Sequence, residues 1–192
     1  MAFVQARLWL PLLLFVAGIG GCAAASGGHG PEIHDLDHVR HYPLDLRAEP
    51  ASVVVFISPW CPIVNSYAVT FRRLQERFPE VTFYFVHADP DVTVAVAREH
   101  ATKYQLPGVV LLDPQQELRR ALDARVTPEA FVIERGAVRY RGQVDNLFLD
   151  FGKRLVAATR HALHDALAAV TTGGTVEVPS VPALGCDIPD LE

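Results

Sequence analysis

Short, uninterrupted runs of apolar residues recur along the chain, and such runs are typical of strands buried on both faces of a sheet. The β-branched run SVVVFI shows this pattern most clearly. Buried strands are predicted at residues 52–57, 81–88 and 108–113. A β-hairpin is predicted after them, with strands at 129–134 and 137–144 joined by a turn that contains Gly136.

Between the strands, apolar residues recur at a spacing of three to four, which is the period of a helix with one buried face. Helices are predicted at residues 63–78, 91–104, 115–123 and about 150–170. Pro62 suits the first turn of the first helix, and the pair Gly173-Gly174 ends the last one. Strands separated by crossover helices, then a hairpin and a closing helix, predict an α/β sandwich with a mixed sheet.

The first two dozen residues follow a different pattern. Arg7 precedes an apolar run at 8–16, and small residues then lead into Cys22. This order predicts a secretory signal peptide, because the apolar run is too short for a comfortable membrane span. The ending IGGC resembles the lipobox of bacterial lipoproteins, which implies that Cys22 is lipidated and becomes the mature N-terminus. The alternative is an ordinary cleaved signal with an incidental cysteine.

Four segments are therefore expected along the chain. They are a signal peptide at 1–21, a flexible Gly/Ala-rich tether at 22–34, a folded domain at 35–174 and an extended tail at 175–192. The protein is expected to be exported to the bacterial periplasm or cell envelope and held at the membrane by its lipid anchor.

Composition and charge narrow the classes of function. Half of the 192 residues are hydrophobic, which suits a globular core and argues against general disorder. The formal net charge is −5, and Lys and Arg are scattered along the chain. We therefore do not expect a nucleic-acid partner.

Cys61 carries the candidate chemistry. It lies where the strand at 52–57 gives way to a helix, and the unpaired amide donors of a helix N-terminus stabilise a thiolate. Trp60 beside it is expected to cover the sulfur on one side. The chain has three cysteines, and if Cys22 is lipidated only Cys61 and Cys186 keep a free thiol. In an exported protein, two such cysteines are expected to meet as a disulfide at some stage.

The order strand-Trp-Cys-Pro-helix, with Thr127-Pro128 later before a strand, resembles the thioredoxin superfamily. The segments CPIVNSYAVTFRRL, TPEAFVIERGAVRYRGQVDN and VPSVPALGCDI are similar to the secreted redoxin proteins of the AhpC/TSA-like group, over residues 36–188. The resemblance implies a thioredoxin-like three-layer α/β sandwich, with a mixed sheet flanked by helices. It also implies a cis bond before Pro128 and an additional helix-strand insertion at 91–113.

The same resemblance implies a thiol–disulfide oxidoreductase without a cofactor. Cys61 would be the nucleophile, and Cys186 the resolving cysteine, since position 64 is valine and a CxxC pair is impossible. The site would be framed by five residues, namely Ser58, Trp60, Pro62, Thr127 and Pro128. Partners would be protein thiols and disulfides, or a small peroxide.

Two alternatives remain open. The first is a peroxiredoxin-like thiol peroxidase, in which Cys61 becomes a sulfenic acid before Cys186 closes the disulfide. Peroxiredoxins have a serine or threonine where this chain has Ser58, but their proline falls at Val54 and their arginine is not clearly placed, although Arg125 is near. The second is a non-catalytic module, in which a Cys61–Cys186 disulfide is a permanent staple.

A cluster of histidines and aspartates lies at the start of the predicted domain. It contains His34, Asp35, Asp37, His38 and His41. Such a group can bind copper or zinc, but the segment also suits an edge hairpin with its histidines in solvent, and the hairpin is favoured here.

Other polar residues have less specific interpretations. His87, at a strand end, could act as a proton shuttle, but a hydrogen-bonded loop histidine is the favoured expectation. Asn65 and Tyr67 belong to the redoxin-like segment and are expected to orient the site, although core packing explains Tyr67 equally well. The pair Asp145-Asn146 matches the redoxin pattern and could simply cap a turn.

Overall fold

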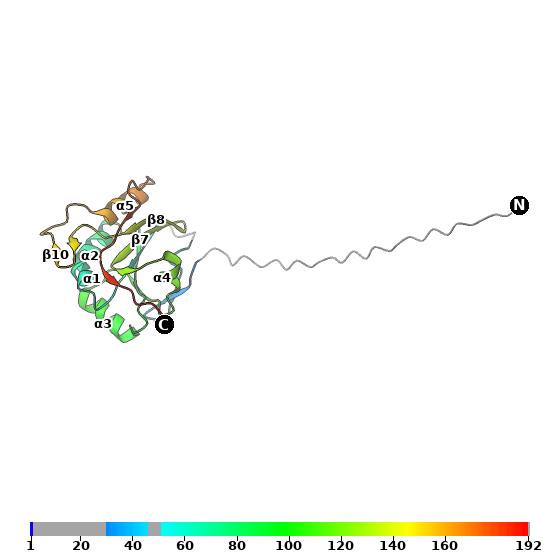
Figure 1. Ribbon diagram of the computed structural model, residues 1–192, viewed down its shortest axis with the longest axis horizontal. Helices are drawn as coiled ribbons and strands as arrows, with labels where there is room; N and C mark the ends of the chain where they lie inside the picture. Colours follow the sequence, from blue (N-terminus) through cyan, green and yellow to red (C-terminus); the bar gives the residue numbers. More distant parts are fainter. Residues whose placement is uncertain (2–29, 46–50, 192) are drawn as a thin grey trace.

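The structure is a computed structural model that describes residues 30–45 and 51–191, together with Met1 (Figure 1). The predicted lipidation site Cys22, the signal peptide beyond Met1 and most of the predicted tether lie outside these residues. Within the described ranges, no helix is both long and apolar enough to cross a membrane.

Eight strands form one mixed sheet in the order β11-β8-β7-β3-β4-β5-β1-β2. They are β1 (Ile33–Asp35), β2 (Arg40–His41), β3 (Ser52–Phe56), β4 (Thr82–His87), β5 (Val109–Leu112), β7 (Glu129–Glu134), β8 (Ala137–Gly142) and β11 (Ser180–Val181). Strands β3, β4 and β5 are parallel, and β7 pairs antiparallel with both β3 and β8. The mixed sheet predicted from the sequence is confirmed.

Helices cover both faces of this sheet. They are α1 (Pro62–Ser66), α2 (Ala68–Arg77), α3 (Val94–Tyr104), α4 (Glu117–Leu122) and α5 (Ala162–Thr171). Helices α2 and α5 contribute Phe71 and Leu163 to one core cluster, and α4 contributes Leu118 to the other. The result is the predicted three-layer sandwich, in which α3 and β5 form the additional helix-strand pair (Figure 1).

Strand β3 connects the two cores. All five of its residues are buried, and successive side chains point to opposite faces. Val53 and Val55 join the cluster under α2 and α5, whereas Val54 and Phe56 join the cluster under α4. A strand with no solvent-facing side needs apolar residues at every position, which explains the continuous run in the sequence.

The helix predicted at 150–170 is wrong in its first half. Helix α5 begins only at Ala162, and the residues before it form the small hairpin β9 (Phe148–Asp150) and β10 (Lys153–Arg154). Gly152 lies between these strands with φ +74°, a left-handed conformation that interrupts a helix. The apolar residue at position 151 is 65% exposed, so helical spacing here does not reflect a buried face.

The C-terminal tail crosses the domain as extended chain (Figure 1, red). Its first strand, β11, pairs parallel with β8 at the edge of the large sheet. Farther along, β12 (Cys186–Asp187) pairs antiparallel with β6 (Val126–Thr127), a two-residue strand outside that sheet. The tail is therefore attached to the domain on both sides of its middle section.

We expect Gly142→Ala to lower the free energy of unfolding by about 1–3 kcal/mol. Gly142 has φ +137°, and a Cβ there would collide with the carbonyl oxygen of Val181 in β11. Gly152→Ala is the matched control, because φ is also positive there and no atom lies within 4 Å of the added Cβ. Thermal unfolding followed by circular dichroism measures both, and equal melting temperatures would contradict the proposed role of this close approach.

Candidate active site

Cys61 lies at the junction between β3 and α1. It is the N-cap residue of α1, and Pro62 occupies the first helical position, as predicted. The loop before it is closed by two hydrogen bonds at Ser58, whose carbonyl accepts from the Cys61 amide (3.3 Å) and whose Oγ accepts from the Trp60 amide (3.3 Å). Ser58 and Pro62 thus fix the backbone that carries the sulfur.

The Cys61 side chain is covered by the tail. Residue Cys61 is 1% exposed, whereas Trp60 is 57% exposed, so most of this tryptophan faces solvent. The atoms that face the Cys61 sulfur are the Thr127 carbonyl oxygen at 3.0 Å and the Cys186 sulfur at 2.7 Å. The tail and β6 therefore enclose the Cys61 sulfur.

The two sulfurs are in position to form a disulfide. Their 2.7 Å separation is close to the covalent S–S length of about 2.05 Å. In the structure both are thiols, with the Cys186 S–H donating to Cys61 and the Cys61 S–H donating to Thr127. The structure therefore brings together the two cysteines on which the predicted chemistry depends.

Thr127 and Pro128 form the wall opposite Cys61. Their peptide bond is cis, as the resemblance to the thioredoxin superfamily implies, and both residues are buried. Thr127 pairs with Cys186 in the β6–β12 register, and its Oγ1 donates to the Cys186 carbonyl oxygen at 3.4 Å. Thr127 thus contacts both cysteines, one through its carbonyl and the other through its hydroxyl.

Burial raises the pKa of the Cys186 thiol to about 12, and its hydrogen bond to the Cys61 sulfur adds to the rise. With the tail docked, Cys186 therefore keeps its proton at neutral pH. Cys186 is only partly buried, in contrast to Cys61. The two sulfurs thus differ in exposure.

A partly buried ion pair holds the backbone next to Pro128. The Glu129 carboxylate, which is 6% exposed, accepts from Arg141 at 2.9 Å and from the amide of Arg125 at 2.9 Å. The Arg125 side chain itself is largely exposed and pairs with Asp123. Arg125, the arginine considered for the peroxidase alternative, thus binds the carboxylate of Asp123 at the surface.

Tyr67, the residue between α1 and α2, connects these two helices to the loop after β8. Its hydroxyl donates to Asp145 Oδ1 at 2.8 Å, and the same oxygen accepts from the amide of Leu147. Burial and then this hydrogen bond raise the pKa of Tyr67 well above its ordinary value, so the phenol stays protonated. The adjacent Asn146 accepts from the amides of Thr159 and Arg160. Asp145 and Asn146 therefore both accept hydrogen bonds from backbone amides and hold the loop after β8 in place.

A buried histidine pair lies behind α1. The Asn65 amide nitrogen donates to the Pro59 carbonyl oxygen at 3.2 Å, so its Oδ1 is left to accept from His100 Nε2 at 2.9 Å. His100 Nδ1 then faces His87 Nε2 at 3.5 Å. Sequence analysis missed His100, because one polar residue in a helix carries no signal that it is buried.

His87 differs from the expected loop histidine. It is the last residue of β4 and is fully buried, and its Nδ1 makes no hydrogen bond within the described residues. Burial lowers the pKa of His87 to about 3 and that of His100 to about 4. Both rings are therefore neutral at physiological pH.

The N-terminal histidines form the edge hairpin that was the favoured expectation. Strands β1 and β2 pair antiparallel, and His34 and His38 are exposed. His41 is half-buried, and its Nε2 lies 2.9 Å from Asp35 Oδ2. Asp35 also accepts from two backbone amides of the turn, so its carboxylate closes this hairpin.

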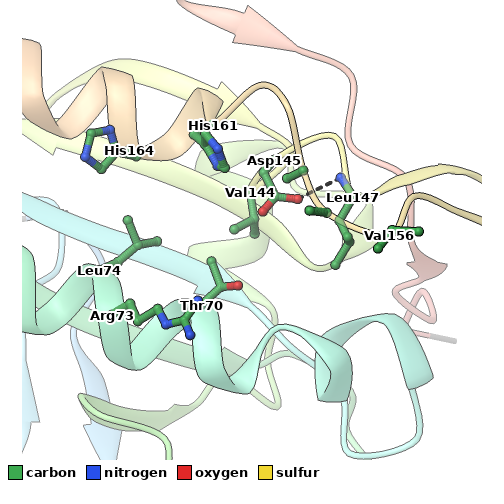
Figure 2. A pocket seen from close by; sticks show the side chains of 11 residues that line it. Thr70, Arg73, Leu74, Val144, Asp145, Leu147, Val156, His161 and His164 are labelled. Atoms are coloured by element: carbon green, nitrogen blue, oxygen red, sulfur yellow. Dashed lines mark hydrogen bonds between the residues drawn. The ribbon is translucent and has the colours of Figure 1, made fainter.

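A separate cleft of about 540 Å³ opens between α2 and the loop that leads into α5 (Figure 2). Thr70, Arg73 and Leu74 form one wall, and His161 and His164 lie on the other. Neither cysteine lines this cleft. Asp145 lines the cleft and also accepts the hydrogen bond from Tyr67.

We expect the free energy of unfolding to fall as the pH is lowered from about 6.5 to 4. The pKa values of His87 and His100 in the folded state lie below the unfolded value, so the unfolded chain binds more protons in this window. Each histidine contributes a slope of up to roughly 1.4 kcal/mol per pH unit. Urea unfolding at several pH values measures this slope.

His100→Gln should reduce the slope, because it removes one of the two buried imidazoles. His34→Gln, at an exposed position, is the control for the loss of a histidine. An identical slope in the wild-type protein and His100→Gln would contradict the assignment.

Comparisons with known proteins identify a family match and solved structures of similar fold. The model of the AhpC/TSA family matches residues 38–141, more than half of the chain. A search of curated proteins found no match. Among solved structures, an uncharacterized conserved protein from Geobacillus kaustophilus is 25% identical, with a TM-score of 0.73 over 84% of this chain and 90% of that one.

Two further structures share the fold. A hypothetical protein from Sinorhizobium meliloti 1021 is 24% identical, with a TM-score of 0.71 over 84% of this chain and 92% of that one. A secreted Mycobacterium tuberculosis disulfide oxidoreductase, homologous to E. coli DsbE, is 17% identical, with a TM-score of 0.54 over 75% of this chain and 96% of that one. At these identities the likeness establishes the fold alone.

Proposed function

The chain belongs to the AhpC/TSA family, and on that basis we propose that it is an exported thiol–disulfide oxidoreductase of the thioredoxin fold. Cys61 is the nucleophile, and Cys186 is the distal resolving cysteine. The observation that carries this proposal is the 2.7 Å contact between the two sulfurs. The sulfurs belong to the chain itself, so the reaction requires no prosthetic group.

The proposed reaction proceeds in two exchanges. The Cys61 thiolate attacks one sulfur of a client disulfide, and the other client sulfur leaves as a thiolate and takes up a proton. Cys186 then attacks the Cys61 sulfur of the mixed disulfide, and its proton passes to the client sulfur that is released. The client gains two electrons, and the protein is left with a Cys61–Cys186 disulfide, which an external thiol reduces.

The environment of each sulfur supports these roles. Cys61 is held by the hydrogen bonds of the Ser58 loop at the end of a fully buried strand, so its position is fixed. Cys186 lies on the tail, in a strand of two residues, and can move with it. While the tail is docked, burial and the hydrogen bond to Cys61 raise the pKa of Cys186, so this residue is held as a thiol.

The proposed location rests on the N-terminal sequence. The signal-peptide pattern and the lipobox-like ending at Cys22 support export and a lipid anchor in the periplasm or cell envelope. A disulfide-forming pair is stable in such an oxidising compartment. Suitable partners there are protein thiols and disulfides.

We expect Cys61→Ser to reduce the rate of insulin disulfide reduction at least 100-fold, because it removes the attacking sulfur. Cys186→Ser should instead accumulate a mixed disulfide between Cys61 and the client, visible by mass spectrometry after acid trapping. Cys22→Ser is the matched control and should retain the activity of the purified chain, because Cys22 takes no part in the exchange.

Peroxide consumption distinguishes the peroxidase alternative. If the chain turned over hydrogen peroxide rapidly, lost this activity in Cys61→Ser and failed to reduce insulin, the exchange proposal would be wrong. Undiminished insulin reduction by Cys61→Ser would contradict the role of this cysteine in either reaction.

A further inference from the structure

The cleft between α2 and the loop that leads into α5 lies apart from the thiol chemistry, because neither cysteine lines it. Its volume is about 540 Å³, within the range of about 300–1,000 Å³ that is typical of small-molecule sites. Figure 2 shows Thr70 and Leu74 on the α2 wall, with His161 and His164 across the cleft from them. The cleft is therefore large enough to hold a small ligand.

Apolar side chains from three segments line this cleft. Leu74, Val144 and Leu147 are buried members of the core cluster under α2 and α5. Val156 also lines the cleft and is fully exposed, and Ala158 is partly buried against the same cluster. Because these side chains come from α2, the loop after β8 and the segment before α5, they can cover more than one apolar group of a ligand.

A carboxylate oxygen without a partner lies within this apolar lining. Asp145 is 5% exposed, and the hydrogen bonds that its carboxylate accepts, from the Tyr67 hydroxyl and the Leu147 amide, both go to Oδ1. Oδ2 accepts no hydrogen bond from the described residues, and Figure 2 shows it directed into the cleft beside Val144. In so buried a residue, little water competes for this oxygen. An ammonium group is the donor that also matches its charge.

A cation without a partner lies on the α2 wall. Arg73 lines the cleft, and its guanidinium makes no ion pair or hydrogen bond within the part of the chain that the structure describes. By contrast, Arg72 donates to the Tyr104 carbonyl oxygen, and Arg77 lies over the Phe78 ring. A free guanidinium can bind a carboxylate through two parallel N–H donors. The cleft thus offers one contact for a cation and one for an anion.

We propose that this cleft binds a short apolar peptide with free ends, of about two or three residues. The ammonium group of the peptide binds Asp145 Oδ2, and its carboxylate binds Arg73. Its apolar side chains cover Leu74, Leu147 and Val156. Two opposite charges on separate walls select a zwitterion over a simple acid or amine. The site adds a ligand to the proposed thiol exchange and does not depend on that reaction.

Three peptides test the two charged contacts on the full chain by isothermal titration calorimetry. They are Leu-Leu, N-acetyl-Leu-Leu, which lacks the ammonium group, and Leu-Leu-amide, which lacks the carboxylate. We expect both modified peptides to bind at least about tenfold more weakly than Leu-Leu, because each leaves one charged group of the cleft without a partner. No saturable binding of Leu-Leu, or equal affinities for the three peptides, would overturn the proposal.

Matched variants assign each contact. Asp145→Asn keeps Oδ1 for Tyr67 and the Leu147 amide but replaces Oδ2 by an NH₂ group. It should weaken the binding of Leu-Leu at least about tenfold and change that of N-acetyl-Leu-Leu little. Equal losses for these two peptides would contradict the ammonium contact.

Arg73→Gln should weaken the binding of Leu-Leu at least about tenfold and change that of Leu-Leu-amide little. Arg77→Gln, on the same helix and outside the lining, is the matched control and should bind Leu-Leu as the wild-type protein does. Equal affinities of Arg73→Gln and Arg77→Gln for Leu-Leu would contradict the carboxylate contact.

Cys61→Ser separates this site from the proposed thiol exchange. This variant should bind Leu-Leu as tightly as the wild-type protein, while its insulin reduction is lost. Normal insulin reduction by a wild-type protein that does not bind Leu-Leu would overturn the peptide site and leave the exchange proposal intact. Loss of Leu-Leu binding in folded Cys61→Ser would contradict a site that is separate from the sulfur chemistry.

Discussion

The contact between the sulfurs of Cys61 and Cys186 is the interaction on which the proposed chemistry of this protein depends. In a CxxC site the second sulfur comes from the next turn of the same helix, but here that position is the buried Val64. The partner sulfur comes instead from a segment 125 residues away in sequence. The short antiparallel pairing of β12 with β6 makes this contact possible.

The fold gives the two cysteines different degrees of freedom. Cys61 follows a strand whose every residue is buried between two cores, so movement of its backbone would disturb both. Cys186 belongs to a two-residue strand that is held by few hydrogen bonds and by the close approach of Gly185 to Thr127. The proposed reaction uses this difference, with Cys61 as a fixed nucleophile and Cys186 as a resolving cysteine that moves with the tail.

The features that the sequence predicted well have local signals. The continuous apolar run at 52–57 indicates a strand that is buried on both faces. The cis bond before Pro128 follows from the family resemblance that Thr127-Pro128 helps to carry. The helix predicted at 150–170 failed because spacing alone does not show whether a face is covered, and Gly152 breaks the chain there. His100 was missed because its partners come from other elements. The register of β12 on β6 likewise has no local signal.

The reduction potential of the Cys61–Cys186 pair tests the redox role most directly. The full chain would be equilibrated in glutathione buffers of graded potential, its thiols trapped, and the peptides containing Cys61 and Cys186 quantified. We expect a disulfide between these two cysteines that titrates above about −250 mV, as a working exchange pair does. A disulfide that resists reduction below about −300 mV would identify a permanent staple and contradict the enzymatic role.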